Sequence, residues 1–365
     1  MVYIMMKPAS GKCNMECSYC FYKDEISKRE VGDYGMMSTK TLECIIEKAI
    51  DKANKECTFA YQGGEPTLAG ITFFEKSMEY QKKYNVKGIR IQNVIQTNGY
   101  HIDEMWCQFF KKNNFLVGVS LDGIKNTHDR FRRNIKGEDT YFVILRNIEL
   151  LKKYEVEFNI LTVVNKITAN KIGRIYENYR KMDFQYQQYI ACMNSLGESK
   201  FENEYSLTAE EYGKFLCRLF ELWMIDRENG REVHIRQFEN WLRILNGGIP
   251  EACEQRGICA RQTVIEADGS IFPCDFYALD SYKIGNINEN TLEESDKNRE
   301  RSGFIESSYN HSEECLNCEY FAVCRGNCNR YRIGGKHFLC AGYKMFFEKN
   351  YNVLVRLAGE MTWRK

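Results

Sequence analysis

The chain has 365 residues, with 51 basic and 50 acidic side chains and a formal net charge of +1. This balance excludes a protein that attracts nucleic acid or an anionic membrane surface by bulk charge, so neither is expected as a partner. The apolar start, residues 1–8, is too short for a signal peptide or a membrane span, and we expect it to form a first buried strand. We therefore expect a cytoplasmic protein, and metal or cluster binding explains its sixteen cysteines better than a disulfide framework, because reducing compartments keep thiols free of disulfides.

Three cysteines directly follow this first strand, at a spacing that fits one tight loop: Cys13, Cys17 and Cys20. Cysteine thiolates hold iron–sulfur clusters, and a four-iron cluster normally takes four of them. Three ligands on one loop would leave one iron open, where a ligand or substrate can bind. The alternative is a zinc knuckle, but zinc sites favour two paired C-x2-C units and this run contains one.

Strands and helices alternate beyond the loop. Hydrophobic periodicity predicts helices at residues 39–50, 72–84, 103–112, 141–153 and 170–181. Short apolar runs predict strands at residues 58–62, 89–96, 116–121, 157–164 and 184–190. Such alternation indicates βαβ units in a parallel sheet. About six units precede residue 195, fewer than the eight of a closed barrel. The predicted fold is therefore α/β, an open partial (β/α)6 barrel.

Polar and glycine residues collect at the carboxyl ends of the predicted strands, where ligands sit in such folds. They are Gln62, Gly63, Gly64, Glu65, Gln96, Asn98, Ser120 and Asp122. A glycine pair after a strand lets the backbone approach a ligand closely, although a GGEP turn by itself is more often only a turn. Their clustering at strand ends indicates one shared pocket.

Arginines follow the fourth strand in the run at residues 128–133. A run of charges is usually a solvated face. An arginine is nevertheless the natural bidentate partner of a carboxylate, which makes Arg132 a candidate binding residue.

Residues 196–250 interrupt the alternation. We expect a loop at 197–200, a helix capped by Thr208 and a second helix at 236–245. The aromatic residues of the first helix fall on one face and are interpreted as packing. We interpret the whole segment as a helical bridge between two halves of the chain.

Eight cysteines then appear within ninety residues of sequence, enough for two fully ligated four-iron clusters. They are Cys253, Cys259, Cys274, Cys315, Cys318, Cys324, Cys328 and Cys340. Zinc ribbons use similar pairs, and spacing alone does not name the metal. Residues 262–266 and 270–272 predict a hairpin across an Asp-Gly turn.

The run at residues 13–20 resembles the CxxxCxxC signature of the radical SAM superfamily. The resemblance implies that the open iron chelates the amino and carboxylate groups of S-adenosylmethionine. It further implies that the GGE turn holds the methionine amino group and that Ser120 and Arg132 hold the carboxylate. Tyr22, Gln62, Gln96 and Asn98 complete the expected cofactor-binding set.

The cysteine-rich half resembles the SPASM domain appended to radical SAM enzymes that modify peptides and proteins. Three [4Fe-4S] clusters follow from this resemblance. Its connectivity implies a nearer auxiliary cluster on Cys253, Cys259, Cys274 and Cys328. The farther auxiliary cluster would use Cys315, Cys318, Cys324 and Cys340. The implied domains are a radical SAM partial barrel at 1–195, the bridge at 196–250 and a SPASM domain with a C-terminal helix at 251–365.

Five segments narrow the resemblance to the anaerobic sulfatase-maturating enzymes: residues 6–10, 61–70, 96–99, 157–161 and 273–277. That family implies oxidation of a cysteine or serine in an unfolded or nascent sulfatase to Cα-formylglycine. It places a catalytic aspartate at Asp275, directly after Cys274. A carboxylate within reach of the substrate proton is a suitable base, whereas a turn aspartate that caps local amides is the alternative. The electron donor would be a ferredoxin or flavodoxin.

Two other functions fit parts of the sequence. A radical SAM maturase that installs thioether or other crosslinks in a ribosomally made peptide would share the scaffold, and fold does not determine function. Because the first strand is expected almost at residue 1, we expect no amino-terminal peptide-recognition domain of the kind that such maturases often carry, which favours the sulfatase interpretation. An iron–sulfur electron carrier or redox sensor would explain the clusters but not the GGE turn and the polar strand ends.

Overall fold

The computed structural model describes residues 2–196 and 203–360, so the loop expected at 197–200 lies outside the described residues. The chain divides into two compact units. The first unit comprises Met1–Leu121, His128–Asn159 and Arg261–Phe304, and the second comprises Asp122–Thr127, Ile160–Ala260 and Ile305–Lys365. The domain limits expected at residues 195 and 250 stay a prediction.

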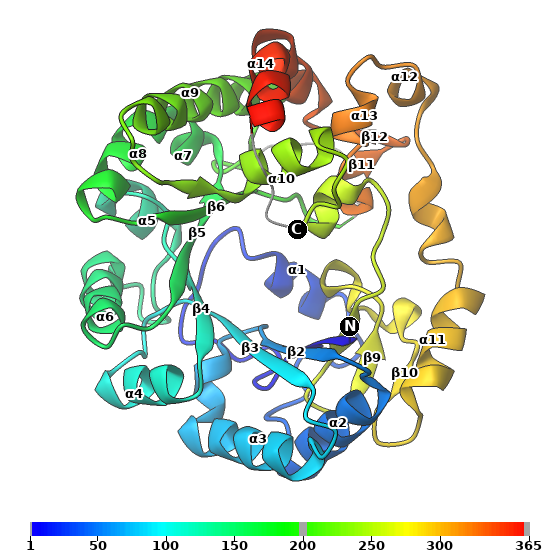
Figure 1. Ribbon diagram of the computed structural model, residues 1–365. Helices are drawn as coiled ribbons and strands as arrows, with labels where there is room; N and C mark the ends of the chain where they lie inside the picture. Colours follow the sequence, from blue (N-terminus) through cyan, green and yellow to red (C-terminus); the bar gives the residue numbers. More distant parts are fainter. Residues whose placement is uncertain (1, 197–202, 361–365) are drawn as a thin grey trace. The chain divides into compact units, whose positions relative to one another are not determined.

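The first unit is built on a sheet whose centre is parallel (Figure 1). In spatial order its strands are β10 (Gly285–Asn286), β9 (Ser270–Phe272), β8 (Thr263–Ile265), β1 (Val2–Met6), β2 (Glu56–Tyr61), β3 (Arg90–Thr97) and β4 (Phe115–Ser120). The strands β8, β1, β2, β3 and β4 pair in parallel, whereas β9 is antiparallel to both of its neighbours, β8 and β10. The predicted first strand and the predicted Asp-Gly hairpin are both present. Because β8 pairs with β1, the hairpin lies beside the amino-terminal strand.

Amphipathic helices cover this sheet. Those expected from periodicity are α2 (Thr39–Lys52), α3 (Ile71–Tyr84), α4 (Glu104–Lys112) and α6 (Tyr141–Lys153). In α2 the Ser38 hydroxyl caps the first turn, and the apolar face expected from the sequence is buried. Three helices were not predicted: α1 (Phe21–Ser27), α5 (Lys125–Phe131) and α11 (Leu292–Arg301). They are short or strongly charged, so their hydrophobic periodicity is weak.

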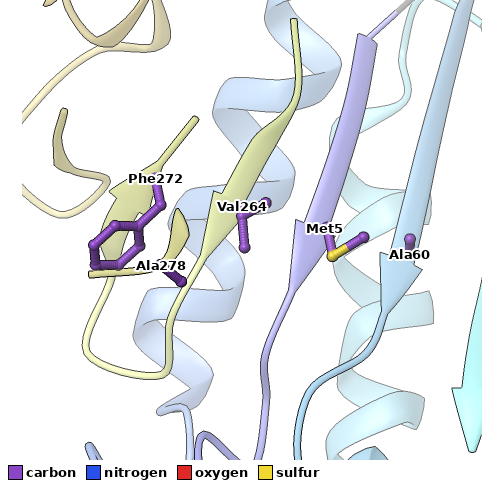
Figure 2. Packing of buried hydrophobic residues seen from close by; sticks show 5 residues of the cluster. All are labelled: Met5, Ala60, Val264, Phe272 and Ala278. Carbon is purple, nitrogen blue, oxygen red and sulfur yellow. The ribbon is translucent and has the colours of Figure 1, made fainter. Parts of the chain in front are cut away.

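One hydrophobic cluster packs the first strands of the chain against the hairpin of β8 and β9, which comes much later in the sequence. Figure 2 shows Met5 of β1 and Ala60 of β2 beside Val264, Phe272 and Ala278 from the hairpin region. Val264 and Phe272 are fully buried. Burial of a side chain of this size contributes about 1.5–3 kcal/mol, so the cluster holds the hairpin firmly on the first strand.

The second unit carries three parallel strands and a group of helices. The strands are β5 (Phe158–Val164), which enters this unit at Ile160, then β6 (Tyr186–Ala191) and β7 (His234–Ile235). The helices are α7 (Lys166–Asn170), α8 (Ile172–Lys181), α9 (Ala209–Glu228), α10 (Arg236–Leu245), α12 (Glu313–Leu316), α13 (Phe321–Cys324) and α14 (Cys340–Glu360), of which α9 and α14 are the longest. A small hairpin, β11 (Arg332–Ile333) and β12 (Lys336–His337), completes it.

Helix α9 agrees with its sequence signals. Thr208 forms a capping box with Glu211, and the aromatic stripe is buried, with Phe220 packing on Phe238 and Phe346. The helix predicted at 170–181 is present as α8, which begins at Ile172 and ends at Lys181. The short helix α7, which Asn165 caps and Lys171 separates from α8, was not predicted.

Short 3-10 helices occupy several connections: η1 (Pro66–Ala69), η2 (Cys253–Arg256), η3 (Asp275–Tyr277), η4 (Asp280–Tyr282), η5 (Glu306–Tyr309) and η6 (Asn329–Tyr331). Of the helices that the structure describes, none is long and apolar enough to span a bilayer. Residues 2–196 and 203–360 include all sixteen cysteines, and no disulfide joins any of them.

Candidate active site

The loop with Cys13, Cys17 and Cys20 leads from β1 to α1 and is held by its own unit. The backbone amides of Glu16 and Ser18 donate to the carbonyls of Arg133 and Phe131, at 2.7 and 3.0 Å. All three cysteines are partly buried, and burial raises the pKa of the Cys13 thiol to about 12. The Cys13 thiol also interacts electrostatically with the other two, so the three sulfurs lie near one another.

The turn at Gln62–Glu65 lies directly against this loop. The Glu65 amide donates to the carbonyl of Lys12 at 2.8 Å. Gly64 has φ +52°, and a Cβ there would lie 2.2 Å from the same carbonyl oxygen. A side chain at Gly64 would therefore separate the turn from the cysteine loop, which explains the glycine. Gly63, with φ +100°, leaves space that the side chain of Lys7 fills, 2.7 Å from the position of a Cβ.

Glu65 is fully buried and joins two strand ends. Its Oε1 accepts hydrogen bonds from the amide and hydroxyl of Thr67 and from the Thr97 hydroxyl, at 2.7–3.0 Å. Its Oε2 accepts from the Asn98 amide at 2.7 Å. Burial raises the pKa of the Glu65 carboxyl, and these donors lower it. The side chain thus ties the GGEP turn after β2 to the turn after β3.

Two side chains expected to bind cofactor approach the cysteine sulfurs. Asn98 Nδ2 lies 3.7 Å from Cys13 Sγ, and Arg132 Nη1 lies 3.6 Å from Cys17 Sγ. Both side chains are largely buried, as is Ser120 at the end of β4. Gln96 is half-buried near the end of β3. Parallel pairing therefore places these candidates of the first unit at one edge of the sheet.

Asp275 is buried and held by two side chains. Its Oδ1 accepts from Lys7 Nζ at 2.5 Å, and its Oδ2 accepts from Gln62 Nε2 at 2.7 Å. Lys7 is fully buried directly after β1, and Gln62 directly follows β2. These contacts reach across the sheet, unlike those of an aspartate that only caps its own turn. Each carboxylate oxygen keeps a lone pair for one further donor.

We call Asp275, Lys7 and Gln62 the aspartate clasp. A second buried group of charged and polar side chains lies beside it. Lys7 Nζ sits 3.8 Å above the centre of the Tyr22 ring, a cation–π contact. The Tyr22 hydroxyl donates to Glu266 Oε1, which also pairs with Arg29 Nη1 at 2.6 Å. Burial, followed by the charge of Glu266, raises the pKa of the Tyr22 hydroxyl. The ring of Tyr22 is thereby fixed beneath Lys7.

Seven cysteines of the second unit form two groups. Cys324 interacts electrostatically with Cys315, Cys318 and Cys340, the set expected for the farther cluster. Cys328 interacts instead with two other thiols, those of Cys253 and Cys259. Cys274 belongs to the first unit and follows β9.

Family models match both halves of the chain. Residues 8–178 match the "Radical SAM superfamily", and residues 253–319 match the SPASM "Iron-sulfur cluster-binding domain". A "Cysteine-type anaerobic sulfatase-maturating enzyme" of Clostridium novyi (strain NT) is 44% identical over 99% of this chain and 98% of its own length.

The chain belongs to the anaerobic sulfatase-maturating enzymes.

Two further relatives of this sulfatase-maturating enzyme are informative. A "Serine-type anaerobic sulfatase-maturating enzyme" of Bacteroides thetaiotaomicron is 32% identical, covering 95% of this chain and 89% of its own. The solved structure "Native anSMEcpe with bound AdoMet and Cp18Cys peptide" matches with a TM-score of 0.94 and 41% identity, covering 98% of this chain and 99% of the other. The predicted fold class, with a radical SAM region and a SPASM region, is confirmed. The chain is an enzyme, and its cofactors are [4Fe-4S] clusters and S-adenosylmethionine.

The residues of this sulfatase-maturating enzyme fit those cofactors. A buried thiol with a raised pKa is neutral unless a cation binds it, and a coordinating metal deprotonates a thiol outright. The amide of Asn98 and the guanidinium of Arg132 add donors toward the sulfurs, as expected around anionic clusters. Among the described residues, no three histidine, cysteine or carboxylate side chains surround a position for one metal ion.

Sequence reasoning missed three buried residues of this site: Lys7, Arg29 and Glu266. The available signal was weak. Lys7 directly follows a buried apolar strand and Glu266 directly precedes the Asp-Gly turn, so both lie at strand ends where functional side chains gather. Arg29 carries no comparable signal.

Proposed function

We propose that this enzyme oxidises a cysteine side chain in an unfolded or nascent sulfatase polypeptide to Cα-formylglycine. The observation that carries the proposal is the 44% identity with a cysteine-type enzyme over nearly the full length of both chains. The serine-type relative is more distant, at 32% identity. The buried Asp275, with two donors and remaining lone pairs, suits a reaction that must remove a proton from a thiol.

The chain's own residues take defined roles in this proposal. Cys13, Cys17 and Cys20 would hold the first cluster, on the loop against which the GGEP turn lies. When bound there, the cluster and S-adenosylmethionine supply hydrogen-atom abstraction chemistry. Arg132 and Ser120 hold the carboxylate of the methionine moiety, and the turn backbone holds its amino group. Remaining expected contacts are Tyr22, Gln62, Gln96 and Asn98.

Asp275 is the proposed catalytic base. Lys7 and Gln62 fix both carboxylate oxygens, so the base is oriented before the substrate arrives. A positioned carboxylate within hydrogen-bond reach accepts the thiol proton at one oxygen.

The eight cysteines of the SPASM region hold the two auxiliary clusters, in the sets Cys253, Cys259, Cys274 and Cys328, and Cys315, Cys318, Cys324 and Cys340. We propose a cytoplasmic enzyme that receives electrons from a ferredoxin or flavodoxin. No disulfide joins the cysteines of the described residues, which supports the proposal of a reducing compartment.

The test uses reconstituted enzyme, a reductant, S-adenosylmethionine and a short sulfatase-like peptide carrying cysteine at the target position. We expect release of 5′-deoxyadenosine and conversion of the peptide to the formylglycine mass, faster than with a matched serine peptide. A reaction without S-adenosylmethionine is the control. A crosslinked peptide in place of an aldehyde would support a peptide maturase, and no 5′-deoxyadenosine would support an electron carrier.

A further inference from the structure

Arg332 connects three backbone segments of the second unit through its guanidinium group. Its Nε donates to the carbonyl of Gly326 at 3.0 Å, and its Nη1 donates to that of Ser308 at 2.7 Å. Its Nη2 donates to the carbonyls of Gly257, at 2.5 Å, and Asn327. A fifth, longer contact of 3.5 Å reaches the carbonyl of Asn310. All five N–H groups of an arginine are thus accounted for.

These segments are the ones that carry the cysteines of both auxiliary sets. Gly257 lies between Cys253 and Cys259, and Asn327 lies between Cys324 and Cys328. The segments also contact one another, since a Cβ on Gly257 would lie 2.2 Å from the carbonyl oxygen of Arg325. Arg332 therefore holds the loops of both sets at one point.

The Arg332 guanidinium interacts electrostatically with cysteine thiols and forms a salt bridge with no carboxylate of the described residues. Among residues 203–360 and the rest of the described chain, no carboxylate lies within salt-bridge distance of its guanidinium. Its electrostatic partners are thiols, two from each auxiliary set: Cys328, Cys259, Cys315 and Cys324. An arginine stays protonated in proteins, so this cation is permanent.

The two histidines near Arg332, His311 and His337, do not add a positive charge beside these thiols. Burial, and then the charge of Arg332, lowers the pKa of His311 and of His337, the latter to about 3. Both are therefore neutral near pH 7. Lys336 also lies near two thiols of the farther set, but it is partly exposed and paired with Glu314 at 2.7 Å.

We propose that Arg332 is a positioning residue that raises the reduction potentials of both auxiliary clusters. The proposal rests on the two ligand sets proposed above, and it is independent of the substrate. Reduction adds a negative charge to a cluster, and a fixed cation nearby stabilises the reduced form. Net charge and exposure are among the factors that set such potentials. One guanidinium between both sets would favour electron uptake at both clusters together.

The test is an electron paramagnetic resonance titration of the full chain with Cys13, Cys17 and Cys20 replaced by Ala, so that auxiliary signals dominate. Arg332→Gln removes the charge, Arg332→Lys retains it, and Lys336→Gln is the matched control. Iron content and thermal unfolding are measured on every variant.

We expect Arg332→Gln to lower both midpoint potentials, so that at the wild-type midpoint much less than half of each cluster is reduced. Arg332→Lys should stay near the wild type, and Lys336→Gln should leave the nearer cluster unchanged. Unchanged potentials in Arg332→Gln with full iron content would overturn the proposal and leave only a structural role. If Arg332→Gln loses iron, the Arg332→Lys variant provides the test. A fall of both midpoint potentials in that variant, which retains the positive charge, would also overturn the proposal.

Discussion

Asp275 is held between Lys7 and Gln62, and this group includes two buried charges that are costly to remove from water. Lys7 and Asp275 are a buried ion pair, with side-chain exposures of 0% and 8%. Burial of two charges is costly, and such a pair is retained for geometry more readily than for stability. Gln62 and the Tyr22 ring complete the surroundings of the two charges. The clasp therefore indicates orientation of the carboxylate as its main role.

Replacement of Asp275 by Asn is predicted to leave iron content and S-adenosylmethionine binding unchanged but to lower formylglycine formation on the order of a hundredfold or more, because a general base is lost. The measurement is product mass against time, with iron analysis in parallel. Product formation near the wild-type rate would remove Asp275 from the mechanism.

Replacement of Lys7 by Met should lower kcat for formylglycine by roughly 10- to 100-fold, because small misplacements of a reacting group have effects of that size. Methionine keeps the apolar stem that packs against Gly63. Binding of S-adenosylmethionine and KM for the peptide should change little. The exposed Lys55→Met is the control for loss of a charge.

A double-mutant cycle separates orientation from stability for this lysine. In the Asp275→Asn background, Lys7→Met should cause no further loss, since coupled residues are non-additive. Full additivity of the two losses would show that Lys7 acts elsewhere.

At the scale of elements, the site depends on turns that follow neighbouring parallel strands. The GGEP turn after β2 contacts the cysteine loop after β1, and Glu65 joins it to the turn after β3. Such close backbone approach is possible only where no Cβ intervenes.

Gly64→Ala is predicted to disrupt assembly of the first cluster and to lower stability by about 1–3 kcal/mol, because a positive φ and a backbone clash both oppose the side chain. The visible absorbance of the cluster and thermal unfolding report the two effects. The control is Gly88→Ala, at φ +64° with no atom within 4 Å of the new Cβ. It should lose some stability and keep the cluster; equal cluster loss in both variants would contradict the contact.

At the scale of the whole molecule, the proposed ligands divide into an opening loop and a cysteine-rich second half. The first set lies on one loop of the first unit. Its removal should therefore leave the other two sets able to assemble.

The triple variant with Cys13, Cys17 and Cys20 replaced by Ala should lose S-adenosylmethionine cleavage and retain iron for two clusters, about eight atoms. Iron analysis and 5′-deoxyadenosine release measure this. Continued release would contradict the assignment of the radical cluster.

The five remaining cysteines should each tolerate Ser or Ala without loss of iron: Cys44, Cys57, Cys107, Cys192 and Cys217. Cys57, Cys107 and Cys192 are buried, as free cysteines usually are. Iron loss in any one variant would show a misassigned ligand.

Local sequence patterns were enough to predict the positions of many helices and the family of this protein. Helical periodicity located α2, α3, α4, α6 and α10, and cysteine spacing together with the GGEP turn indicated the family, which the comparison confirms. Periodicity and spacing are properties of adjacent residues, so one sequence suffices to read them.

Only the tertiary structure decided the clasp around Asp275. Lys7 and Asp275 are 268 positions apart, and Arg29 and Glu266 are 237 apart. They meet because β8 pairs with β1 and the Phe272 cluster holds the hairpin there. Strand order depends on which apolar faces bury one another across the whole chain, and no local spacing encodes that choice.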